Sequence, residues 1–344
     1  MKCLVKNESA VGLTLKDTEK PSPNDNEILI KVKKAAICGT DLHIWNWDSW
    51  AQEKIKPPMT VGHEFMGVIE EVGKKIKNFK IGDRVSVESH ITGTKSRNAR
   101  AGKLHLDPDT VNLGVDTDGA FAEYVKVPES NVVPLPDSVS DEVGAILDPF
   151  GNAVHATLSF DLVGEDVLIT GAGPIGIMSA AIAEHVGARR ILLTDVNDHR
   201  LELAKKVCSA ELLNPTNSSI SEKMKDMGLK EGFDVGLEMS GSEFALRDMV
   251  DNMIMGGKVA LLGIPSKEIK IDLNKIIFKA LNLKAIYGRE IYETWYKGLA
   301  LIDSGLKIEE IITHRFKFED YKKAFDLLNE GKAGKVILSW DSVS

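Results

Sequence analysis

One glycine-rich turn, Gly171-Ala-Gly-Pro-Ile-Gly176, constrains the fold of this chain more than any other feature. The strand-forming run Asp166–Thr170 leads into it, and the small, apolar stretch Ile177–Val186 after it has the composition of a buried helix. A second apolar run, Ile191–Thr194, is followed at once by Asp195. The order strand, glycine turn, helix, strand and carboxylate is typical of a βαβ unit that binds a dinucleotide.

Each part of this unit has a physical role. We expect Gly171 to permit the turn, Gly173 to let the backbone approach a pyrophosphate, and Gly176 to let the helix pack closely on the sheet. The helix N-terminus offers free N–H groups to the phosphates. Asp195 would accept the hydroxyl protons of an adenosine ribose, which favours NAD over NADP. The alternative is a glycine turn without a ligand, but the surrounding pattern favours the cofactor.

Length and composition exclude several classes of protein. The 344 residues suffice for two domains or one large α/β unit, and 43% hydrophobic with 27% charged residues is ordinary for a globular protein. A net charge of −8 argues against a general binder of nucleic acid or anionic membranes. There is no apolar run of membrane-spanning length and no signal peptide at the N-terminus. Because the three cysteines cannot form an even disulfide framework, we expect a cytoplasmic protein.

The pattern of elements changes at about residue 150. Before it, short strands separated by turn signals are predicted at Glu27–Val32, Met66–Val72, Arg84–Glu88 and Phe121–Val127. After it, strands at 167–170, 191–195, 235–238 and 258–262 alternate with helices, which indicates a doubly wound parallel sheet and an α/β fold. Helices at 292–303 and 318–330 and a strand at 335–339 follow. Two domains in series, or a nucleotide domain inserted into the first, both fit this pattern.

The β-rich part contains a second constellation. Cys38 lies in Cys38-Gly-Thr-Asp-Leu-His43, and His63 and Glu64 follow Gly62. Thiolate, imidazole and carboxylate are all zinc ligands, and a catalytic zinc uses about three of them and keeps one position open. Taken singly, a buried cysteine, a hydrogen-bonded histidine and an exposed glutamate are each commoner. Taken together, beside a nicotinamide-type fold, they favour a metal site.

In combination, these two motifs resemble the zinc-dependent medium-chain alcohol dehydrogenases. The match runs nearly end to end and includes the strings 36–40, 148–155, 159–166, 232–240, 286–290, 293–296 and 312–316. The resemblance implies a GroES-like catalytic domain at 1–147 and 290–344, interrupted by a Rossmann NAD-binding domain at 148–289. It is strongest to the members that oxidise L-threonine, and implies this substrate, NAD, zinc, a homotetramer and functional coupling to 2-amino-3-ketobutyrate CoA ligase.

Two alternatives to this activity stay open. A sibling enzyme that oxidises a polyol or 2,3-butanediol would share every metal and cofactor residue. A catalytically silent member that binds a nucleotide as a regulator is the second. Retention of Cys38, Thr40, His43, His63 and Glu64 together argues against the silent protein, because it has no need for the full set.

The resemblance also assigns roles to further residues. It implies a proton relay through the Thr40 hydroxyl and the His43 imidazole, and it places Asp148 near the metal without binding it. Glu64 would leave the zinc more readily than Cys38 or His63. On the cofactor side the resemblance adds Ile175, Arg200, Leu262, Gly263, Ile264, Ile286 and Tyr287. Arg200 could instead indicate the 2′-phosphate of NADP, but Asp195 would repel that group.

One family feature is missing from the sequence. Most relatives carry a structural zinc held by four cysteines, and the family spacing puts these ligands at Gly93, Ser96, Ala99 and Asp107. This set cannot hold a closed tetrahedral zinc site, and the basic residues Lys95, Arg97, Arg100 and Lys103 would repel a cation. The sequence therefore predicts one zinc per subunit, and a segment at about 91–110 that is more mobile than in relatives.

Overall fold

The computed structural model describes residues 1–340, and the chain divides into two compact units, Met1–Asp148 with Ile312–Ser344, and Pro149–Ile311. The expected domain boundaries differ from these units at residue 148, which belongs to the first unit, and at 290–311, which belong to the second. Helix α11 (Glu293–Asp303) accounts for the difference at 290–311, because a Cβ at Gly298 would lie only 3.2 Å from the Phe150 ring of helix α5 (Leu147–Thr157). Residues 341–344 of the expected C-terminal segment lie outside the described residues.

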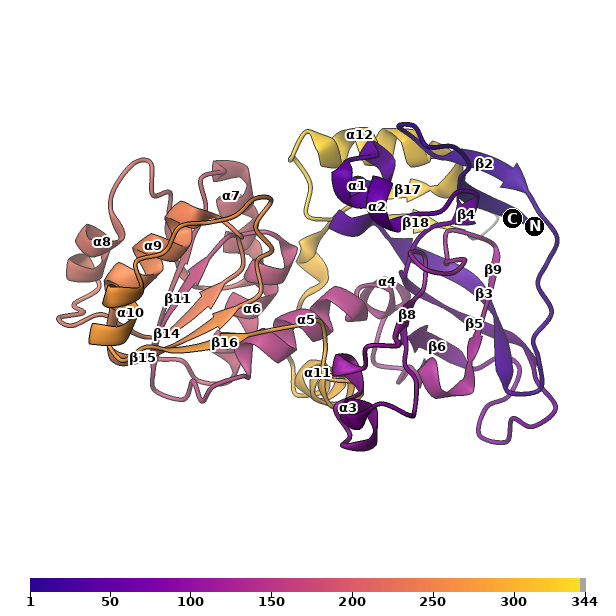
Figure 1. Ribbon diagram of the computed structural model, residues 1–344, viewed down its shortest axis with the longest axis horizontal. Coiled ribbons are helices and arrows are strands. Elements are labelled where there is room, and N and C mark those ends of the chain that lie inside the picture. Colours follow the sequence, from indigo (N-terminus) through magenta and orange to yellow (C-terminus); the bar gives the residue numbers. More distant parts are fainter. Residues whose placement is uncertain (341–344) are drawn as a thin grey trace. The chain divides into compact units, whose positions relative to one another are not determined.

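The first unit is built on a mixed sheet of seven strands (Figure 1). Its order is β10 (Val132–Pro134), β6 (Arg84–Val87), β5 (Glu64–Val72), β3 (Glu27–Ala36), β18 (Lys335–Ser339) and β17 (Ile312–Lys317), with β9 (Tyr124–Pro128) also paired to β3. A smaller sheet has the order β2 (Thr14–Asp17), β1 (Lys2–Lys6) and β4 (Met59–Thr60), and β7 (His90–Ile91) pairs with β8 (Val111–Asn112). Apart from β17 with β18, the paired strands of this unit run antiparallel.

Strand β18 ties the end of the chain to its beginning. Its residues Ile337, Leu338 and Ser339 pair antiparallel with Ala36, Ala35 and Lys34 of β3. Helix α12 (Tyr321–Asn329) adds Tyr321 and Phe325 to the same core, where Phe325 stacks on Trp45 at a centroid distance of 4.5 Å. The second unit is therefore inserted between β10 and β17 of the first sheet, which decides between the two layouts that the element pattern allowed.

The short helices of the first unit lie close to the strand ends. They are α1 (Gly39–Asn46), α2 (Ser49–Lys54), α3 (Arg97–Arg100) and α4 (Asp141–Ala145), with the 3₁₀ turns η1 (Leu104–Leu106), η2 (Glu129–Asn131) and η4 (Phe318–Asp320). Helix α1 begins directly after β3, so residues 37–43 follow a central strand of the sheet. The helix expected at 318–330 is divided into η4 and α12.

The second unit is a doubly wound sheet of six parallel strands (Figure 1). The order is β13 (Glu211–Leu213), β12 (Arg190–Thr194), β11 (Asp166–Thr170), β14 (Phe233–Glu238), β15 (Met253–Leu261) and β16 (Asn282–Ala285). Helix α6 (Pro174–His185) packs on β11 and β12 and contacts α7 (Asp198–Val207). Helix α9 (Glu243–Asn252) packs on β11 and β14 and contacts α8 (Ile220–Asp226) and α10 (Leu273–Phe278). The turn η3 (Glu309–Ile311) ends this unit.

This topology confirms the predicted α/β fold and fixes where a ligand can bind. The strand order reverses at β11, because β12 and β13 lie on one side of it and β14, β15 and β16 on the other. In open parallel sheets, ligands bind outside the carboxyl ends of the strands at this reversal. The glycine turn 171–176 lies directly after β11, at that edge.

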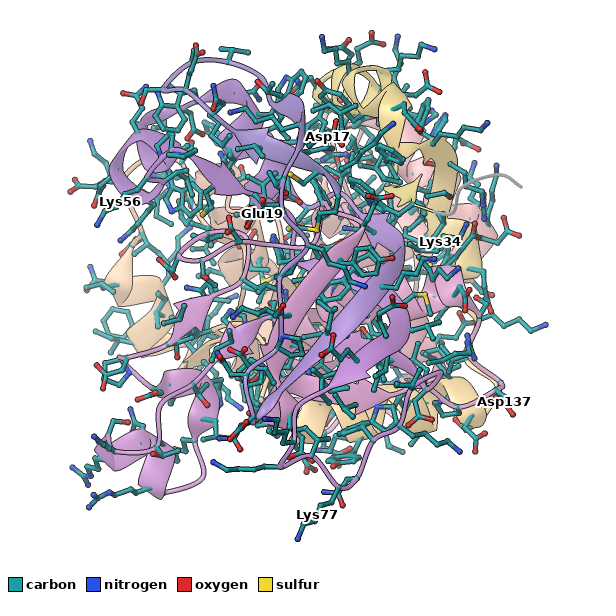
Figure 2. All side chains as sticks on the ribbon, turned by 90° about the vertical axis from the view of Figure 1, so that its right-hand side faces the viewer. Asp17, Glu19, Lys34, Lys56, Lys77 and Asp137 are labelled. Carbon is teal, nitrogen blue, oxygen red and sulfur yellow. The ribbon has the colours of Figure 1, made fainter. Side chains whose placement is uncertain are left out.

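The surface of the first unit carries charges of both signs. Lys56, Lys77 and Asp137 are exposed and project outward (Figure 2). Within residues 1–340, no helix is both long and apolar enough to cross a membrane.

Candidate metal centre and cofactor site

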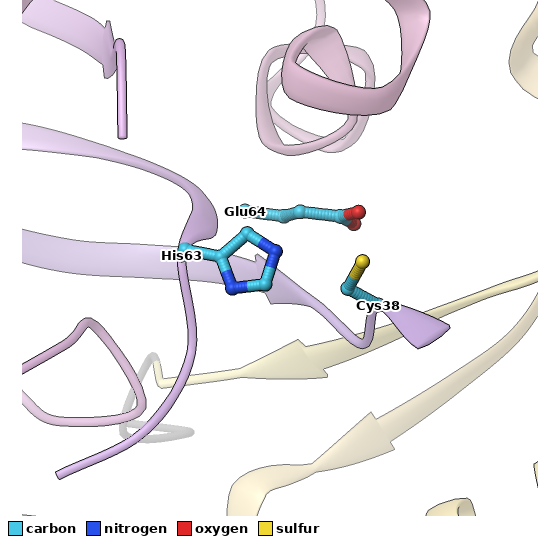
Figure 3. A group of neighbouring side chains, drawn as sticks. All are labelled: Cys38, His63 and Glu64. Atoms are coloured by element: carbon cyan, nitrogen blue, oxygen red, sulfur yellow. The ribbon is translucent and has the colours of Figure 1, made fainter. Parts of the chain in front are cut away.

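Three potential metal ligands come together in the first unit. Cys38 is the N-cap of α1, His63 lies between β4 and β5, and Glu64 is the first residue of β5 (Figure 3). One ligand atom from each, a sulfur, a nitrogen and an oxygen, lies within 4.8 Å of the other two. Register explains the proximity, because Glu64 pairs with Ala36 of β3, two residues before Cys38. The spacing in the sequence does not reveal this pairing.

A glycine is required immediately before the histidine. Gly62 has φ of +91°, which side-chain-bearing residues rarely adopt, and a Cβ there would lie 2.2 Å from the Phe121 ring. The amide N–H of Ala120 donates to the Gly62 carbonyl at 2.8 Å. The backbone is thereby held in the sharp turn that carries His63 and Glu64 to the ligand cluster.

Asp41 lies close to both Cys38 and His63. Its side chain is fully buried, Oδ2 accepts the Cys38 backbone N–H at 2.9 Å, and Oδ1 lies 3.8 Å from His63 Nδ1. This favours Nε2 as the ligating nitrogen, in the carboxylate–histidine–metal arrangement of many metal sites. Burial lowers the pKa of His63, but the negative charges of Cys38, Asp41 and Asp148 more than offset it and raise the pKa to about 10.

Glu64 forms a buried ion pair with a lysine from the other end of the chain. Lys335, the first residue of β18, donates to Glu64 Oε2 and, at 3.0 Å, to the Ile37 carbonyl oxygen. The exposed fractions are 1% for Glu64 and 4% for Lys335. Burial raises the pKa of Glu64, and the charge of Lys335 opposes that shift.

The cluster as it stands is electrostatically incomplete. Among residues 1–340, the buried atoms Asp41 Oδ1, His63 Nδ1 and Glu64 Oε1 have no hydrogen-bond partner. Buried polar atoms are nearly always paired, and buried anions need a compensating cation. A divalent ion held by Cys38, His63 and Glu64 would meet that need with the donor set of a catalytic zinc site. The residues present therefore fit a metal.

The two relay residues expected on α1 lie at different depths. Thr40 is half-buried, and its Oγ1 is 3.7 Å from Cys38 Sγ. His43 is exposed, its Nδ1 lies 2.5 Å from Asp48 Oδ2, and its ring is 5.9 Å from that of Trp50. Thr40 and His43 are three positions apart and therefore lie on one face of α1, which leads from the sulfur to the surface. Asp48, which holds the imidazole, was not anticipated from the sequence.

Asp148 lies close to the ligand cluster without being part of it. It is 5% exposed, and its Oδ2 accepts a hydrogen bond from Ser89 Oγ at 2.8 Å. Its negative charge contributes to raising the pKa values of His63 and Glu64. Asp148 is therefore a buried negative charge near the cluster that is not among its three potential ligands.

In the second unit, a different local feature accounts for each of the three glycines in the turn. Gly171 has φ of +96°, and a Cβ would lie 2.9 Å from the Ser240 backbone nitrogen. A Cβ at Gly176 would lie 1.9 Å from the Gly171 carbonyl oxygen, so no residue with a side chain fits at this position in the first turn of α6. Gly173, the N-cap of α6, has no atom within 4 Å of such a Cβ, which leaves its backbone open to a ligand. Ile175 is half-buried inside the same turn.

Asp195 joins the end of β12 to the glycine turn. Its Oδ2 accepts the Ala172 N–H and its Oδ1 accepts the Asn197 N–H, both at 2.8 Å. Arg200 contacts the same carboxylate, with Nη1 3.5 Å from Oδ2. Oδ2 thus already accepts two hydrogen bonds, whereas Oδ1 accepts one and has capacity left for the expected contact with a ribose hydroxyl.

The remaining expected cofactor residues lie after β15 and β16. Leu262 and Gly263 are half-buried, and both backbone nitrogens donate to the Glu238 carbonyl oxygen, at 2.9 and 3.0 Å. Ile264 is 90% exposed and Tyr287 62%, while Ile286 is buried. Ile264 and Tyr287 therefore expose two large side chains at the carboxyl edge of the parallel sheet, where a dinucleotide would cover them.

Comparison with known proteins decides the family. Residues 24–137 match the Alcohol dehydrogenase GroES-like domain and residues 174–304 the Zinc-binding dehydrogenase family. A curated L-threonine 3-dehydrogenase of Pseudoalteromonas atlantica is 55% identical over 99% of this chain and 100% of its own length. The chain belongs to the zinc-dependent medium-chain alcohol dehydrogenases. The resemblance stated from the sequence is thus confirmed.

Solved structures agree with this assignment of the fold. An Escherichia coli CFT073 protein described as a short chain alcohol dehydrogenase, solved with NADH, is 26% identical over 99% of both chains with a TM-score of 0.90. The 2R,3R-butanediol dehydrogenase of Bacillus subtilis is 27% identical over 99% of both chains with a TM-score of 0.89.

The four positions expected to hold the family's second metal carry no cysteine in this dehydrogenase. Asp107 is 5% exposed, its Oδ2 accepts the Gly93 N–H at 2.5 Å, and hydrogen bonding from the Ser96 hydroxyl lowers its pKa. Ser96 in turn caps α3, accepting the Ala99 N–H at 3.1 Å. The four positions of the family's cysteines are therefore linked by hydrogen bonds, and one carboxylate with one hydroxyl cannot hold a tetrahedral zinc.

Several residues of the dehydrogenase site were missed from the sequence. Asp41 lies inside the Cys38–His43 motif and could have been noticed there as the only carboxylate. Glu238 accepts hydrogen bonds at Oε1 from the Ser240 hydroxyl and from the Ser240 and Gly241 backbones, and so orders the loop after β14. Lys335 carries no local signal, because only strand pairing brings it to the metal centre.

Proposed function

We propose that this chain is an L-threonine 3-dehydrogenase, which oxidises L-threonine with NAD to L-2-amino-3-oxobutanoate and NADH. The observation that carries the proposal is the 55% identity to curated L-threonine 3-dehydrogenases over 99% of the chain. The Cys38, His63 and Glu64 cluster and the glycine turn supply the two chemical requirements, a metal site and a dinucleotide site.

In the reaction, the C–H bond at carbon 3 of threonine breaks, its hydrogen leaves as hydride to the nicotinamide, and the hydroxyl proton leaves to solvent. A zinc bound by Cys38, His63 and Glu64 supplies a Lewis acid, which lowers the pKa of the substrate hydroxyl. Asp41 orients His63 for this role, and Asp148 adds a negative charge that moderates the metal's field.

The proton would leave along α1. The Thr40 hydroxyl can accept a hydrogen bond from the substrate oxygen's proton and donate its own, since it is both donor and acceptor. His43 would receive the proton at the surface, where Asp48 holds its Nδ1. Imidazole suits this position because one ring nitrogen can take up a proton while the other is hydrogen-bonded to Asp48.

For the cofactor, we propose NAD held by the turn from Gly171 to Gly176. Asp195 would bind the adenosine ribose, and its contact with Arg200 offsets the arginine's charge, so a 2′-phosphate is disfavoured. Ile175, Leu262–Ile264 and the pair Ile286 and Tyr287 would line the dinucleotide.

An activity assay tests the proposal against its rivals. Purified protein with zinc and NAD is given L-threonine, 2,3-butanediol or sorbitol, and NADH formation is followed by absorbance. We expect threonine to give the highest kcat/KM. Oxidation of the diol or polyol alone would favour the sibling activity, for which the similarity to the Bacillus subtilis butanediol dehydrogenase is the supporting observation. No NADH from any alcohol, with both ligands bound, would favour the silent nucleotide-binding protein.

We also propose that each chain holds one zinc. The hydrogen bonds that connect Gly93, Ser96, Ala99 and Asp107 support this count, since they occupy the positions where relatives place thiolates. Elemental analysis of protein dialysed against buffer should give one zinc per chain. Two tightly held zinc ions would contradict the proposal.

A homotetramer in the cytoplasm completes the proposal. Leu273, Ile277 and Phe278 of α10 are 62–76% exposed, and nearby β16 is the last strand of its sheet, which supports burial against a second copy. The three cysteines are free thiols, in keeping with a reducing compartment. Light scattering tests the oligomeric state. Coupling to 2-amino-3-ketobutyrate CoA ligase would consume the unstable keto product, and a faster combined rate with that ligase present tests it.

A further inference from the structure

Lys335 is a buried lysine with no place in the reaction described so far. Its side chain is 4% exposed and approaches the metal centre from β18, nearly 300 residues along the chain from Cys38. Buried lysines are uncommon unless a partner compensates their charge. The inference that follows rests on the proposed function, because it concerns the metal that Cys38, His63 and Glu64 would hold.

The two carboxylate oxygens of Glu64 have different surroundings because of Lys335. Its Nζ donates to Glu64 Oε2 and to the carbonyl oxygen of Ile37, the residue before Cys38. Glu64 Oε1 is buried and has no partner among residues 1–340. One oxygen of the carboxylate is thus engaged by the lysine, and the other remains for a metal. The Ile37 contact also fixes the ammonium group next to the start of α1.

We propose that Lys335 is a positioning residue that limits Glu64 to a weak, single-oxygen metal ligand. An ammonium that shares the carboxylate withdraws part of the negative charge that Glu64 offers to the metal. Glu64 can then yield its position to the substrate oxygen, whereas Cys38 and His63, whose side chains accept no hydrogen bond from Lys335 among residues 1–340, keep the metal in place.

The proposal predicts that the charge of Lys335 weakens metal binding. Lys335→Gln tests it, because glutamine can still donate to the Ile37 carbonyl but has no charge. In the cobalt(II)-substituted holoenzyme we expect an altered visible spectrum, because Glu64 becomes a stronger ligand. We also expect metal release to a chelator to slow by about tenfold or more, the size of effect typical of groups that hold metal ligands. The kcat for threonine should fall while its KM changes less.

Two further variants separate this role from a purely structural one. Lys335→Arg keeps the charge, so its cobalt spectrum and release rate should stay near those of the unmodified protein. Glu64→Gln with Lys335→Gln should release metal as Glu64→Gln alone does, because the lysine acts only through that carboxylate. Lys77→Met, at an exposed position of the same unit, is the matched control and should change nothing.

The experiment distinguishes failure of this inference from failure of the proposed function. A Lys335→Gln protein with an unchanged cobalt spectrum and unchanged release rate would overturn the inference. Faster metal release in Lys335→Gln would overturn it too. If Lys335→Gln does not fold, the double variant, in which neither member of the Glu64–Lys335 ion pair is charged, decides by its agreement or disagreement with Glu64→Gln. An unmodified protein that binds no cobalt would instead refute the metal site and the proposed function.

Discussion

The candidate metal centre and the lobe at residues 90–112 differ in the side chains that they offer to a metal ion. At the metal centre, the buried atoms Asp41 Oδ1, His63 Nδ1 and Glu64 Oε1 have no hydrogen-bond partner among residues 1–340, and Cys38, His63 and Glu64 offer the donor set of a zinc site. In the lobe, Asp107 Oδ1 is also buried without a partner, but Asp107 Oδ2 accepts the Gly93 N–H and hydrogen bonding from Ser96 lowers the pKa of the carboxyl. This chain places cysteine, histidine and glutamate together at the first place and has no cysteine at the second. The difference teaches that hydrogen bonds of the Asp107 carboxylate connect the lobe at the positions where thiolates are missing.

The largest expected effect comes from removing the thiolate of the metal centre. Cys38→Ser should lose bound zinc and reduce kcat/KM by on the order of 10³-fold, because Lewis-acid stabilisation is worth several kcal/mol. Zinc content and NADH formation are the measurements. Cys208→Ser, in the second unit, is the matched control. Full activity with zinc still bound in Cys38→Ser would remove the sulfur from the ligand set.

The next largest effect is the pH dependence of metal affinity. In the metal-free protein the pKa of His63 is raised to about 10, above its usual 6.5, so the protonated ring stabilises the fold fully below pH 6.5 and loses that contribution as pH rises through 10. Metal needs the neutral ring, so binding releases this proton. Affinity should therefore rise roughly tenfold per pH unit from 7 to 9. Competition with a chelator measures it, and a flat profile would exclude His63 as a ligand.

The lobe should respond to Asp107 and not to metal. Asp107→Ala removes the acceptor of the Gly93 N–H and should lower the free energy of local opening at 91–110 by about 1–3 kcal/mol. Hydrogen exchange of that segment measures it, with Asp109→Ala at the exposed neighbour as control. A chelator should leave exchange of the segment unchanged. Equal loosening by chelator would show that the lobe does hold a metal.

The smallest expected effect concerns Gly93, whose backbone N–H donates to Asp107. A Cβ at residue 93 would lie 2.9 Å from Asp107 Oδ2, so Gly93→Ala should push the carboxylate away and cost about 1 kcal/mol of local stability. Gly102→Ser provides a contrast, since a Cβ there has nothing within 4 Å, although its φ of +75° adds backbone strain. If Gly93→Ala exchanges like the unmodified protein, the carboxylate contact is unimportant to the lobe.

Local motifs were the part of this molecule that its sequence revealed best. The unit from β11 to Asp195 could be predicted almost residue by residue, because each glycine, strand and cap acts on its immediate neighbours. The division of labour among Gly171, Gly173 and Gly176 follows from backbone sterics alone. Cys38, His63 and Glu64 needed the family resemblance as well, since sequence spacing does not show that β5 pairs with β3.

Long-range partners could not be predicted. Lys335 reaches Glu64 only because β18 adds to the edge of β3, and nothing near residue 335 in the sequence indicates this. The expected boundary at 290 also differed from the observed unit, because α11 packs on α5 of the second unit while an alternating pattern only shows where helices begin and end. Asp107 illustrates a third limit. The missing cysteines predicted the loss of a structural zinc site, but they did not predict the hydrogen bond between Asp107 and the Gly93 N–H.

The pairing of β18 with β3 also orders events on the ribosome. Residues 1–148 emerge first and leave the Lys34–Ala36 edge of β3 open, and the inserted unit can then fold while that edge waits. Only when β18 has emerged does Lys335 arrive beside Glu64. Synthesis of this chain therefore completes the candidate metal centre last. A nascent chain that ends before β18 would contain the second unit but would lack Lys335 beside Glu64.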